Sequence, residues 1–249
     1  MLENDVKFIL SAIGDEPKRV LEVGCGDGRI LVPLAQAGHD VTGFDVNKED
    51  LDGILSKAEK LKNIRWHRAD AVHDDWGSGF DVVVLAGNIL FNIEGIKSAE
   101  AYKQAQELFI QKAASALVPD GYIYIDYFPF APNGRTLLRS GQSCTDESRI
   151  YGPWEYTNND CSVETHTITS GSFDEETGIL RFRRFIERRM PDGETIMEES
   201  ERIKHYATLE HLHKWLCITG FVIELEYEGF DESPITENSN SVVVYARKK

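Results

Sequence analysis

The sequence predicts an α/β fold in which a parallel sheet alternates with helices and a small antiparallel sheet is inserted. Two observations carry this prediction. In residues 19–128, short apolar strands alternate with stretches of helical periodicity, and parallel strands need such crossovers. At Pro129 the alternation stops, and the next helical pattern begins only near Thr208.

The first half contains five expected strands and the helices between them. The strands cover residues 19–23, 41–45, 64–67, 80–85 and 122–128. Helices are expected at 30–37, 47–60 and 98–116, because apolar residues recur there at helical spacing. Asn47 is a favourable N-cap, and residues 118–121 are expected to form the turn before the fifth strand.

The stretch from 129 to 207 is far too long for an ordinary connection in an α/β domain. Three strands are expected in it, at 163–173, 179–190 and 195–206. The middle strand is rich in arginine: Arg181, Arg183, Arg184, Arg188 and Arg189. We expect these arginines to pair with Glu198, Glu199 and Glu201 across a hairpin rather than to hold an acidic ligand.

After the insertion the α/β pattern resumes. Thr208 is the expected N-cap of a helix that ends at Gly220, and strands at 221–228 and 241–247 are expected to pair antiparallel. We therefore expect one domain from residues 1–128 and 208–249. Residues 129–207 are expected to be an inserted β-sheet that serves as a lid or substrate subdomain, because such insertions carry specificity.

Composition limits the classes of partner. Lys and Arg number 27 against 42 Asp and Glu, so the formal charge of −15 disfavours nucleic acid and anionic membranes. No apolar run approaches the roughly 18 residues of a membrane span, and the N-terminus lacks the basic region of a secretory signal. Four scattered cysteines form no metal-binding spacing. We expect a cytoplasmic protein without a metal.

The motif E-V-G-C-G-D-G at residues 22–28 is the clearest sign of a ligand site. Glycines between a strand and a helix let a ligand approach the backbone, and the helix start supplies free N–H groups. Asp45 ends the second strand, where an acid can accept hydrogen bonds from ribose hydroxyls. Arg29 stands where a dinucleotide fingerprint has its third glycine, which weakens the nicotinamide or flavin alternative.

Taken with R-A-D-A at 68–71, F-D-V-V-V-L at 80–85 and L-V-P-D-G-Y at 117–122, this motif resembles the class I S-adenosylmethionine-dependent methyltransferases. The resemblance implies a Rossmann-like, seven-stranded, doubly wound sheet whose last strand is antiparallel. It implies that the ribose binds Asp45, that the adenine binds the Asp70 side chain and the Ala71 amide, and that the methionine part lies on the glycine loop. The cofactor residues implied are Glu22, Gly24, Cys25, Gly26, Asp45, Val46, Asp70, Ala71, Leu85 and Ala86.

A narrower resemblance concerns the acceptor. Leu85–Asn88 and Glu201–Tyr206 are similar to segments of glycine N-methyltransferases, and amino-sugar N-methyltransferases share the inserted sheet. The resemblance implies that Asn88 and Arg202 bind the substrate. Candidate bases or orienting groups are Tyr127, Tyr151, His205 and Tyr206. We thus take Asn88, Tyr127 and His205 as candidate catalytic residues, with Arg202, Tyr151 and Tyr206 beside Asn88 as substrate-binding residues.

The resulting hypothesis is methyl transfer to a small molecule, at an amine nitrogen, by in-line displacement with proximity and orientation catalysis. Three alternatives stay open: a small-molecule O-methyltransferase, a nucleotide-cofactor oxidoreductase, and a cofactor-binding protein without catalysis. The short segment before the first strand favours a monomer or a homodimer.

Overall fold

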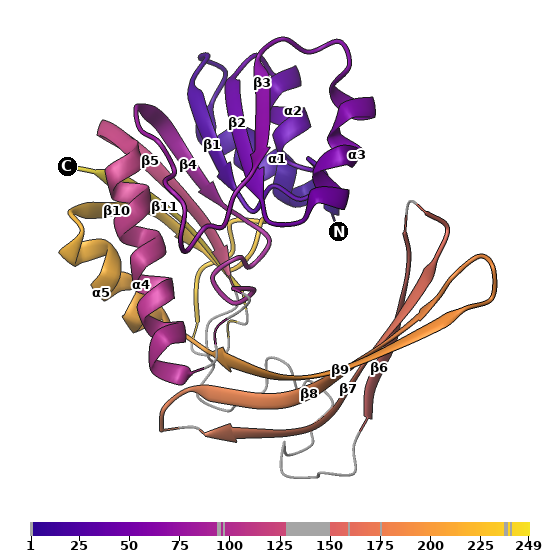
Figure 1. The fold of residues 1–249 in the computed structure, drawn as a ribbon. Helices are drawn as coiled ribbons and strands as arrows, with labels where there is room; N and C mark the ends of the chain where they lie inside the picture. The colour runs from indigo at the N-terminus through magenta and orange to yellow at the C-terminus, as the bar shows by residue number, and fades with distance from the viewer. Residues whose placement is uncertain are drawn as a thin grey trace. The chain divides into compact units, whose positions relative to one another are not determined.

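The structure is a computed structural model that describes residues 2–93, 96, 98–127, 150–158, 160–174, 176–236, 239 and 241–249. The chain divides into two compact units. The first consists of Met1–Ile93, Gln104–Pro129 and Thr208–Lys249, and the second of Glu94–Lys103 and Phe130–Ala207. Each unit is organised around its own sheet (Figure 1).

The first unit contains a seven-stranded sheet in the order β10-β11-β5-β4-β1-β2-β3. Its strands are β1 (Arg19–Val23), β2 (Asp40–Asp45), β3 (Ile64–Arg68), β4 (Phe80–Leu85), β5 (Leu117–Tyr127), β10 (Phe221–Tyr227) and β11 (Val242–Lys248). Strands β1 to β5 pair parallel, and β11 runs antiparallel to both β5 and β10. The predicted α/β sheet with an antiparallel last strand is therefore confirmed.

Helices cover both faces of this sheet. They are α1 (Leu2–Ile13), α2 (Leu31–Gln36), α3 (Lys48–Ala58), α4 (Ala99–Ala116) and α5 (Leu209–Ile218). Apolar residues of α1, α2 and α3 form one buried core with Val20, Val82 and Tyr124 of the sheet. Figure 1 shows α4 and α5 on the opposite face. The expected caps are confirmed, because Asn47 accepts from the Glu49 amide and Thr208 accepts from the His211 amide.

The start of β5 differs from the prediction. The strand begins at Leu117, whereas the sequence predicts a turn over 118–121 and a strand from Tyr122. Leu117 pairs with Phe80, but Tyr122 already pairs with Val82, so the register shifts between these pairs. Asp120 adopts a left-handed φ of 61° within this irregularity. The turn signal of Pro119–Gly121 thus marks a bulge inside a longer strand.

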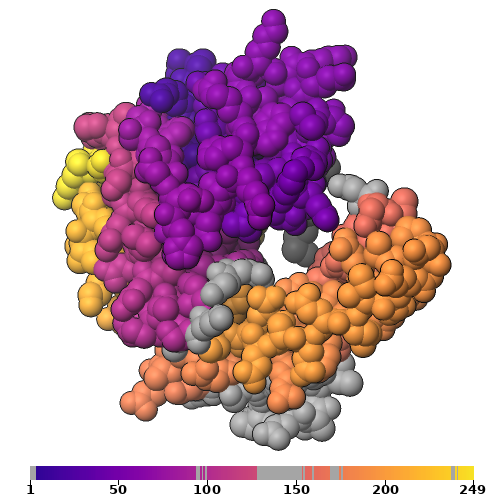
Figure 2. All heavy atoms as spheres, in the orientation of Figure 1, coloured from indigo at the N-terminus to yellow at the C-terminus, as the bar shows by residue number. Residues whose placement is uncertain are grey.

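The second unit contains a four-stranded antiparallel sheet in the order β6-β7-β8-β9. The strands are β6 (Ile150–Thr157), β7 (Val163–Asp174), β8 (Ile179–Arg189) and β9 (Thr195–His205). The last three are confirmed predictions, whereas β6 was not predicted. Figure 2 shows the atoms of the β8–β9 hairpin in orange.

The arginines of β8 are engaged within the sheet, but only partly as expected. Arg183 lies opposite Glu201 and forms an ion pair with Glu199 at 3.5 Å, as predicted. Arg188 instead turns to the β7 side, where its Nε lies 3.3 Å from a Glu164 carboxylate oxygen. The prediction that the whole run faces the β9 glutamates is therefore wrong for Arg188, because the register places it opposite Glu164 of β7 and opposite none of the β9 glutamates.

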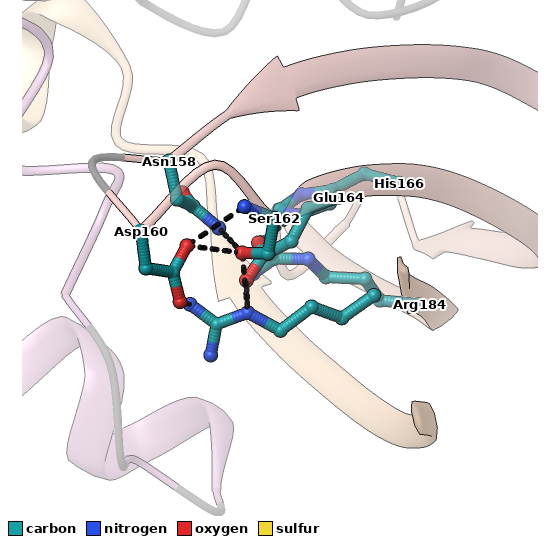
Figure 3. A network of polar contacts seen from close by, with 7 residues as sticks. Asn158, Asp160, Ser162, Glu164, His166 and Arg184 are labelled. Carbon is teal, nitrogen blue, oxygen red and sulfur yellow. Dashed lines mark hydrogen bonds and ion pairs between the residues drawn. The ribbon is translucent and has the colours of Figure 1, made fainter. Parts of the chain in front are cut away.

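A polar network connects the turn between β6 and β7 with β7 and β8 (Figure 3). The Ser162 hydroxyl donates to Asp160 at 2.6 Å and accepts from Asn158 at 3.0 Å. Arg184 donates to Nδ1 of His166, and Nε2 of His166 lies 2.8 Å from Glu164. Since Nδ1 accepts, His166 carries its proton on Nε2 and donates it to Glu164. The network supports an architectural role for these charges.

Candidate active site

The loop between β1 and α2 has the backbone that its glycines permit. Gly24, Gly26 and Gly28 have φ values of 72°, 50° and 81°. The amides of Gly24 and Cys25 both donate to the carbonyl of Phe44, at 2.9 and 3.0 Å. A Cβ added to Gly24 would lie 2.5 Å from Cδ1 of Ile89. Gly24 is therefore needed for both conformation and space.

Asp45 connects the ends of β1 and β2 through its carboxylate. Oδ2 accepts from the Gly26 amide and Oδ1 from the Asn47 amide, each at 2.9 Å. A carboxylate oxygen has two lone pairs, so both oxygens retain capacity for further donors such as ribose hydroxyls. The same bonds hold the glycine loop in its shape. Val46, the next residue, is 51% exposed.

Two residues of the motif, Glu22 and Cys25, are buried. Glu22 is 3% exposed, and no hydrogen bond reaches its Oε2 from the described residues. Burial raises the pKa of Glu22 well above its usual range, although Arg29 opposes this. Burial likewise raises the pKa of the Cys25 thiol, which packs against Gly43. Arg29 forms an ion pair with Asp5 of α1 at 2.6 Å, which explains why arginine suits this position.

The segment after β3 forms a tight turn, residues 70–74. Asp70 Oδ1 accepts from the amides of Val72 and His73, at 2.7 and 3.3 Å. Within the described part of the chain, Asp70 Oδ2 accepts no hydrogen bond and the Ala71 amide donates none. These two groups are thus available to the edge of an adenine, as the resemblance implies. Leu85 and Ala86, at the end of β4, are buried.

A buried carboxylate lies where β4 and β5 end. The Asn88 amide donates to Oδ1 of Asp126 at 3.1 Å, and the Tyr124 hydroxyl donates to Oδ2 at 3.2 Å. Burial raises the pKa of Asp126 to about 6. Asn88 has a left-handed φ of 59°. Asp126 is not among the site residues predicted from the sequence, although an acid at the end of an apolar strand is a usable signal.

Tyr127 follows Asp126 and is 4% exposed. Its hydroxyl has no hydrogen-bond partner among the described residues. Burial raises the pKa of Tyr127 well above its usual range, and Glu226 adds to this. A phenol in this setting is a poor base, so an orienting hydroxyl is the role that its surroundings favour.

The remaining predicted residues belong to the second unit. Arg202 lies opposite Phe182 in the β8–β9 register, and His205 lies opposite Ile179. Because they are three positions apart along β9, Arg202 and His205 project from opposite faces of the sheet. His205 is 2% exposed and Tyr206 is 6% exposed. Tyr151 lies in β6, and its side chain is outside the described residues.

A comparison with family models decides the domain type. Residues 20–121 match the family described as a methyltransferase domain. Residues 20–121 are thus a methyltransferase domain by this match, in line with the resemblance seen in the sequence. The glycine loop, Asp45 and the 70–74 turn all lie within the matched residues of this methyltransferase domain.

Two of the curated relatives match about half of this chain. An uncharacterised methyltransferase of Mycobacterium bovis is 30% identical over 143 residues, which are 55% of this chain and 65% of the relative. A ubiquinone biosynthesis O-methyltransferase of Mesorhizobium japonicum is 27% identical over 51% of this chain and 45% of the relative. The matched regions thus span less than two thirds of these relatives.

Solved structures share the fold over nearly the whole chain. An S-adenosylmethionine-dependent methyltransferase from Clostridium acetobutylicum has a TM-score of 0.72 at 13% identity, covering 100% of this chain and 92% of the other. An amino pentose methyltransferase from Micromonospora echinaspora, solved with S-adenosylmethionine, has a TM-score of 0.61 at 15% identity, covering 100% and 90%. At these identities the likeness establishes the fold.

Two further features concern what the methyltransferase domain can bind. Within the described residues, no group of three or more His, Cys, Asp or Glu side chains is placed to hold a metal ion. In the same part of the chain, every helix is too short or too polar to span a membrane.

Proposed function

We propose that this chain transfers the methyl group of S-adenosylmethionine to a small-molecule acceptor, and that the acceptor atom is an amine nitrogen. The cofactor part of this proposal rests on one observation. Within a methyltransferase domain, the Asp45 carboxylate accepts a hydrogen bond from the Gly26 amide at 2.9 Å. The available Asp70 Oδ2 and Ala71 amide suit the adenine, and Asp45 suits the ribose. The nucleotide-cofactor oxidoreductase considered from the sequence is not proposed.

The protein's part in such a reaction is alignment and exclusion of water. When bound, the cofactor supplies a methyl group that is already activated by its sulfonium. Gly24 and Gly26 allow close approach to the backbone, and Glu22 offers a buried carboxyl that the described residues leave unsatisfied at one oxygen. Asn88 and Tyr127, at the ends of β4 and β5, are proposed to orient the acceptor. An amine also has to lose a proton, to water or to a nearby base.

The amine acceptor rests on three supports. The charge of −15 suits a cationic substrate and penalises nucleic acid. The segments around Asn88 and Arg202 are similar to those of glycine N-methyltransferases. The amino pentose methyltransferase has a similar fold, and the match covers 100% of this chain. We propose that residues 129–207 contribute substrate recognition through Arg202 and Tyr206.

An O-methyltransferase is the second candidate, because a relative of the methyltransferase domain carries that name. One experiment separates the two. The protein is incubated with S-adenosylmethionine and a panel of amines, amino sugars and phenols, and the products are identified by mass spectrometry. N-Methylated products support the proposal, whereas methyl ethers alone would replace it with the O-methyltransferase.

Two other outcomes have equally clear meanings. S-Adenosylhomocysteine binding measured by calorimetry, without turnover of any acceptor in the panel, would favour a cofactor-binding protein without catalysis. Absence of S-adenosylhomocysteine binding would overturn the proposed function as a whole.

A further inference from the structure

The ammonium of Lys112, in α4, is held by three backbone carbonyls. Its Nζ donates to the carbonyls of Ala71, Val72 and Asp74, at 2.9, 2.7 and 2.7 Å. An ammonium has three N–H donors, so these bonds use its full capacity. All of these residues belong to the first unit. Lys112 therefore ties one end of the 70–74 turn to a long helix.

The other end of the turn is held by aspartates. Oδ1 of Asp70 accepts from the amides of Val72 and His73, and Oδ2 of Asp74 accepts from the Asp70 amide at 2.8 Å. The Asp74 amide donates back to the Asp70 carbonyl, also at 2.8 Å. The carbonyls of a single helical turn point towards its C-terminal end and have no partners there. Lys112 supplies these missing partners.

Trp76 binds one of the three carbonyls that Lys112 also binds. Its Nε1 donates to the Ala71 oxygen at 2.9 Å, so this oxygen accepts from both Trp76 and Lys112. The Lys112 ammonium also lies 5.8 Å from the centroid of the Trp76 ring. Trp76 itself is 5% exposed and meets Phe109 of α4 edge to face. The backbone at Ala71 is thus fixed by groups outside the turn.

The fixed residues include the two groups that the proposed function assigns to the adenine. Among the described residues, the Ala71 amide donates no hydrogen bond and Asp70 Oδ2 accepts none. An amide donor and a carboxylate acceptor side by side match the ring nitrogen and the exocyclic amino group of an adenine. Their spacing has to be preserved for both bonds to form, which requires a rigid turn.

We propose that Lys112 is a positioning residue for adenine recognition, which it serves by holding the 70–74 turn through three carbonyls. The inference rests on the proposed function, because it assumes that adenosine binds at this turn. Lys112 does not itself need to touch the cofactor. Its removal is expected to weaken selection of the purine edge rather than binding of the ribose and methionine parts.

The test compares two ligands by calorimetry. S-Adenosylhomocysteine carries the 6-amino group, and S-inosylhomocysteine carries an oxygen in its place. We expect the unmodified protein to prefer the adenosine compound by about tenfold or more, since a wrong donor–acceptor pattern leaves polar groups unpaired. Lys112→Met is expected to weaken binding of S-adenosylhomocysteine by about tenfold and to leave S-inosylhomocysteine nearly unchanged, so the preference collapses.

Two further variants keep the test decisive. Lys103→Met removes the same kind of side chain from the same helix and is expected to change neither affinity. Trp76→Phe keeps a buried ring but loses one donor to Ala71, and should reduce the preference less than Lys112→Met does. If Lys112→Met fails to fold by circular dichroism, the Trp76→Phe result decides.

The outcomes distinguish a failure of the positioning role from a failure of the proposed function. Equal weakening of both ligands, or an unchanged preference in both variants, would overturn the positioning role and leave the proposed function intact. An unmodified protein that binds the two ligands equally would also overturn it. No binding of S-adenosylhomocysteine to the unmodified protein would contradict the proposed function itself.

Discussion

The amide of Asn88 donates to the carboxylate of Asp126 at 3.1 Å, and this bond joins the ends of β4 and β5. It holds Asn88 in a left-handed conformation with a φ of 59°. A residue other than glycine in this region stores backbone strain, which commonly marks a functional position. The pair therefore places the Asn88 side chain at the sheet edge where ligands of α/β proteins bind.

Substitution of Asn88 tests its role toward the acceptor. Asn88→Gly relieves the strain and removes the side chain, whereas Asn88→Ala removes the side chain and keeps the strain. Both are expected to lower kcat/KM for the acceptor by about tenfold or more. The glycine variant should be more stable than the alanine variant by about 1 kcal/mol in urea denaturation. A parallel loss of S-adenosylhomocysteine affinity would contradict an acceptor role.

The raised pKa of Asp126 predicts a pH dependence of stability. Its folded pKa of about 6 exceeds the ordinary 3.8, so the folded state keeps the proton longer as pH rises. Stability contributed by this group is therefore present below pH 3.8 and falls as the pH rises to about 6. Relative to Asp126→Asn, the unmodified protein should lose about 3 kcal/mol of unfolding free energy across this window.

Chemical denaturation of both proteins between pH 4 and pH 7 checks this prediction. Asparagine is neutral throughout and retains an acceptor for the Asn88 amide, so it isolates the ionisation. Parallel stability curves for the two proteins would show that Asp126 ionises normally in the folded state.

Asp45 variants test the cofactor site. Asp45→Asn keeps one acceptor oxygen, and Asp45→Ala removes both oxygens that hold the amides of Gly26 and Asn47. We expect S-adenosylhomocysteine affinity to fall in the order unmodified, Asn, Ala, with the alanine variant losing about 1–3 kcal/mol. Asp52→Ala, an exposed acid paired with Lys48, serves as the control for removing a charge. Unchanged calorimetric affinity in Asp45→Ala would place the ribose elsewhere.

Two glycines of the loop separate conformational strain from crowding. The Cβ added by Gly26→Ala would meet no atom within 4 Å, so this substitution costs only the backbone strain of a φ of 50°. Gly24→Ala adds a contact of 2.5 Å with Ile89. We expect a loss of about 1 kcal/mol for Gly26→Ala and a larger loss for Gly24→Ala. Adding Ile89→Ala to Gly24→Ala should recover part of that difference by relieving the contact, and an unchanged or greater loss would refute the crowding argument.

Tyr127 and Tyr124 form a matched pair for hydroxyl removal. The Tyr127 hydroxyl has no partner among the described residues, whereas the Tyr124 hydroxyl donates to Asp126 at 3.2 Å. Tyr124→Phe should therefore cost about 1 kcal/mol of stability, and Tyr127→Phe should cost nothing. If Tyr127 orients the acceptor, Tyr127→Phe also raises KM. Full activity in Tyr127→Phe would remove it from the site.

Features with local signals were predictable. Asn47 and Thr208 cap helices because their side chains accept from amides two or three residues ahead. Predictions failed where pairing was distant or the pattern was interrupted. The early start of β5 depends on Leu117 pairing with Phe80. Strand β6 is broken by a register shift between Tyr151 and Trp154, so its alternation is not continuous in the sequence.

The sequence by itself determined the α/β class, the glycine loop and the acid that ends β2, because each depends on residues that are close together in the sequence. Only the tertiary structure decided which distant groups meet. Asn88 and Asp126 are 38 residues apart, and Lys112 is 41 residues from Ala71. Such bonds form because crossover helices return successive parallel strands to one sheet edge, a consequence of the whole chain that no local pattern contains.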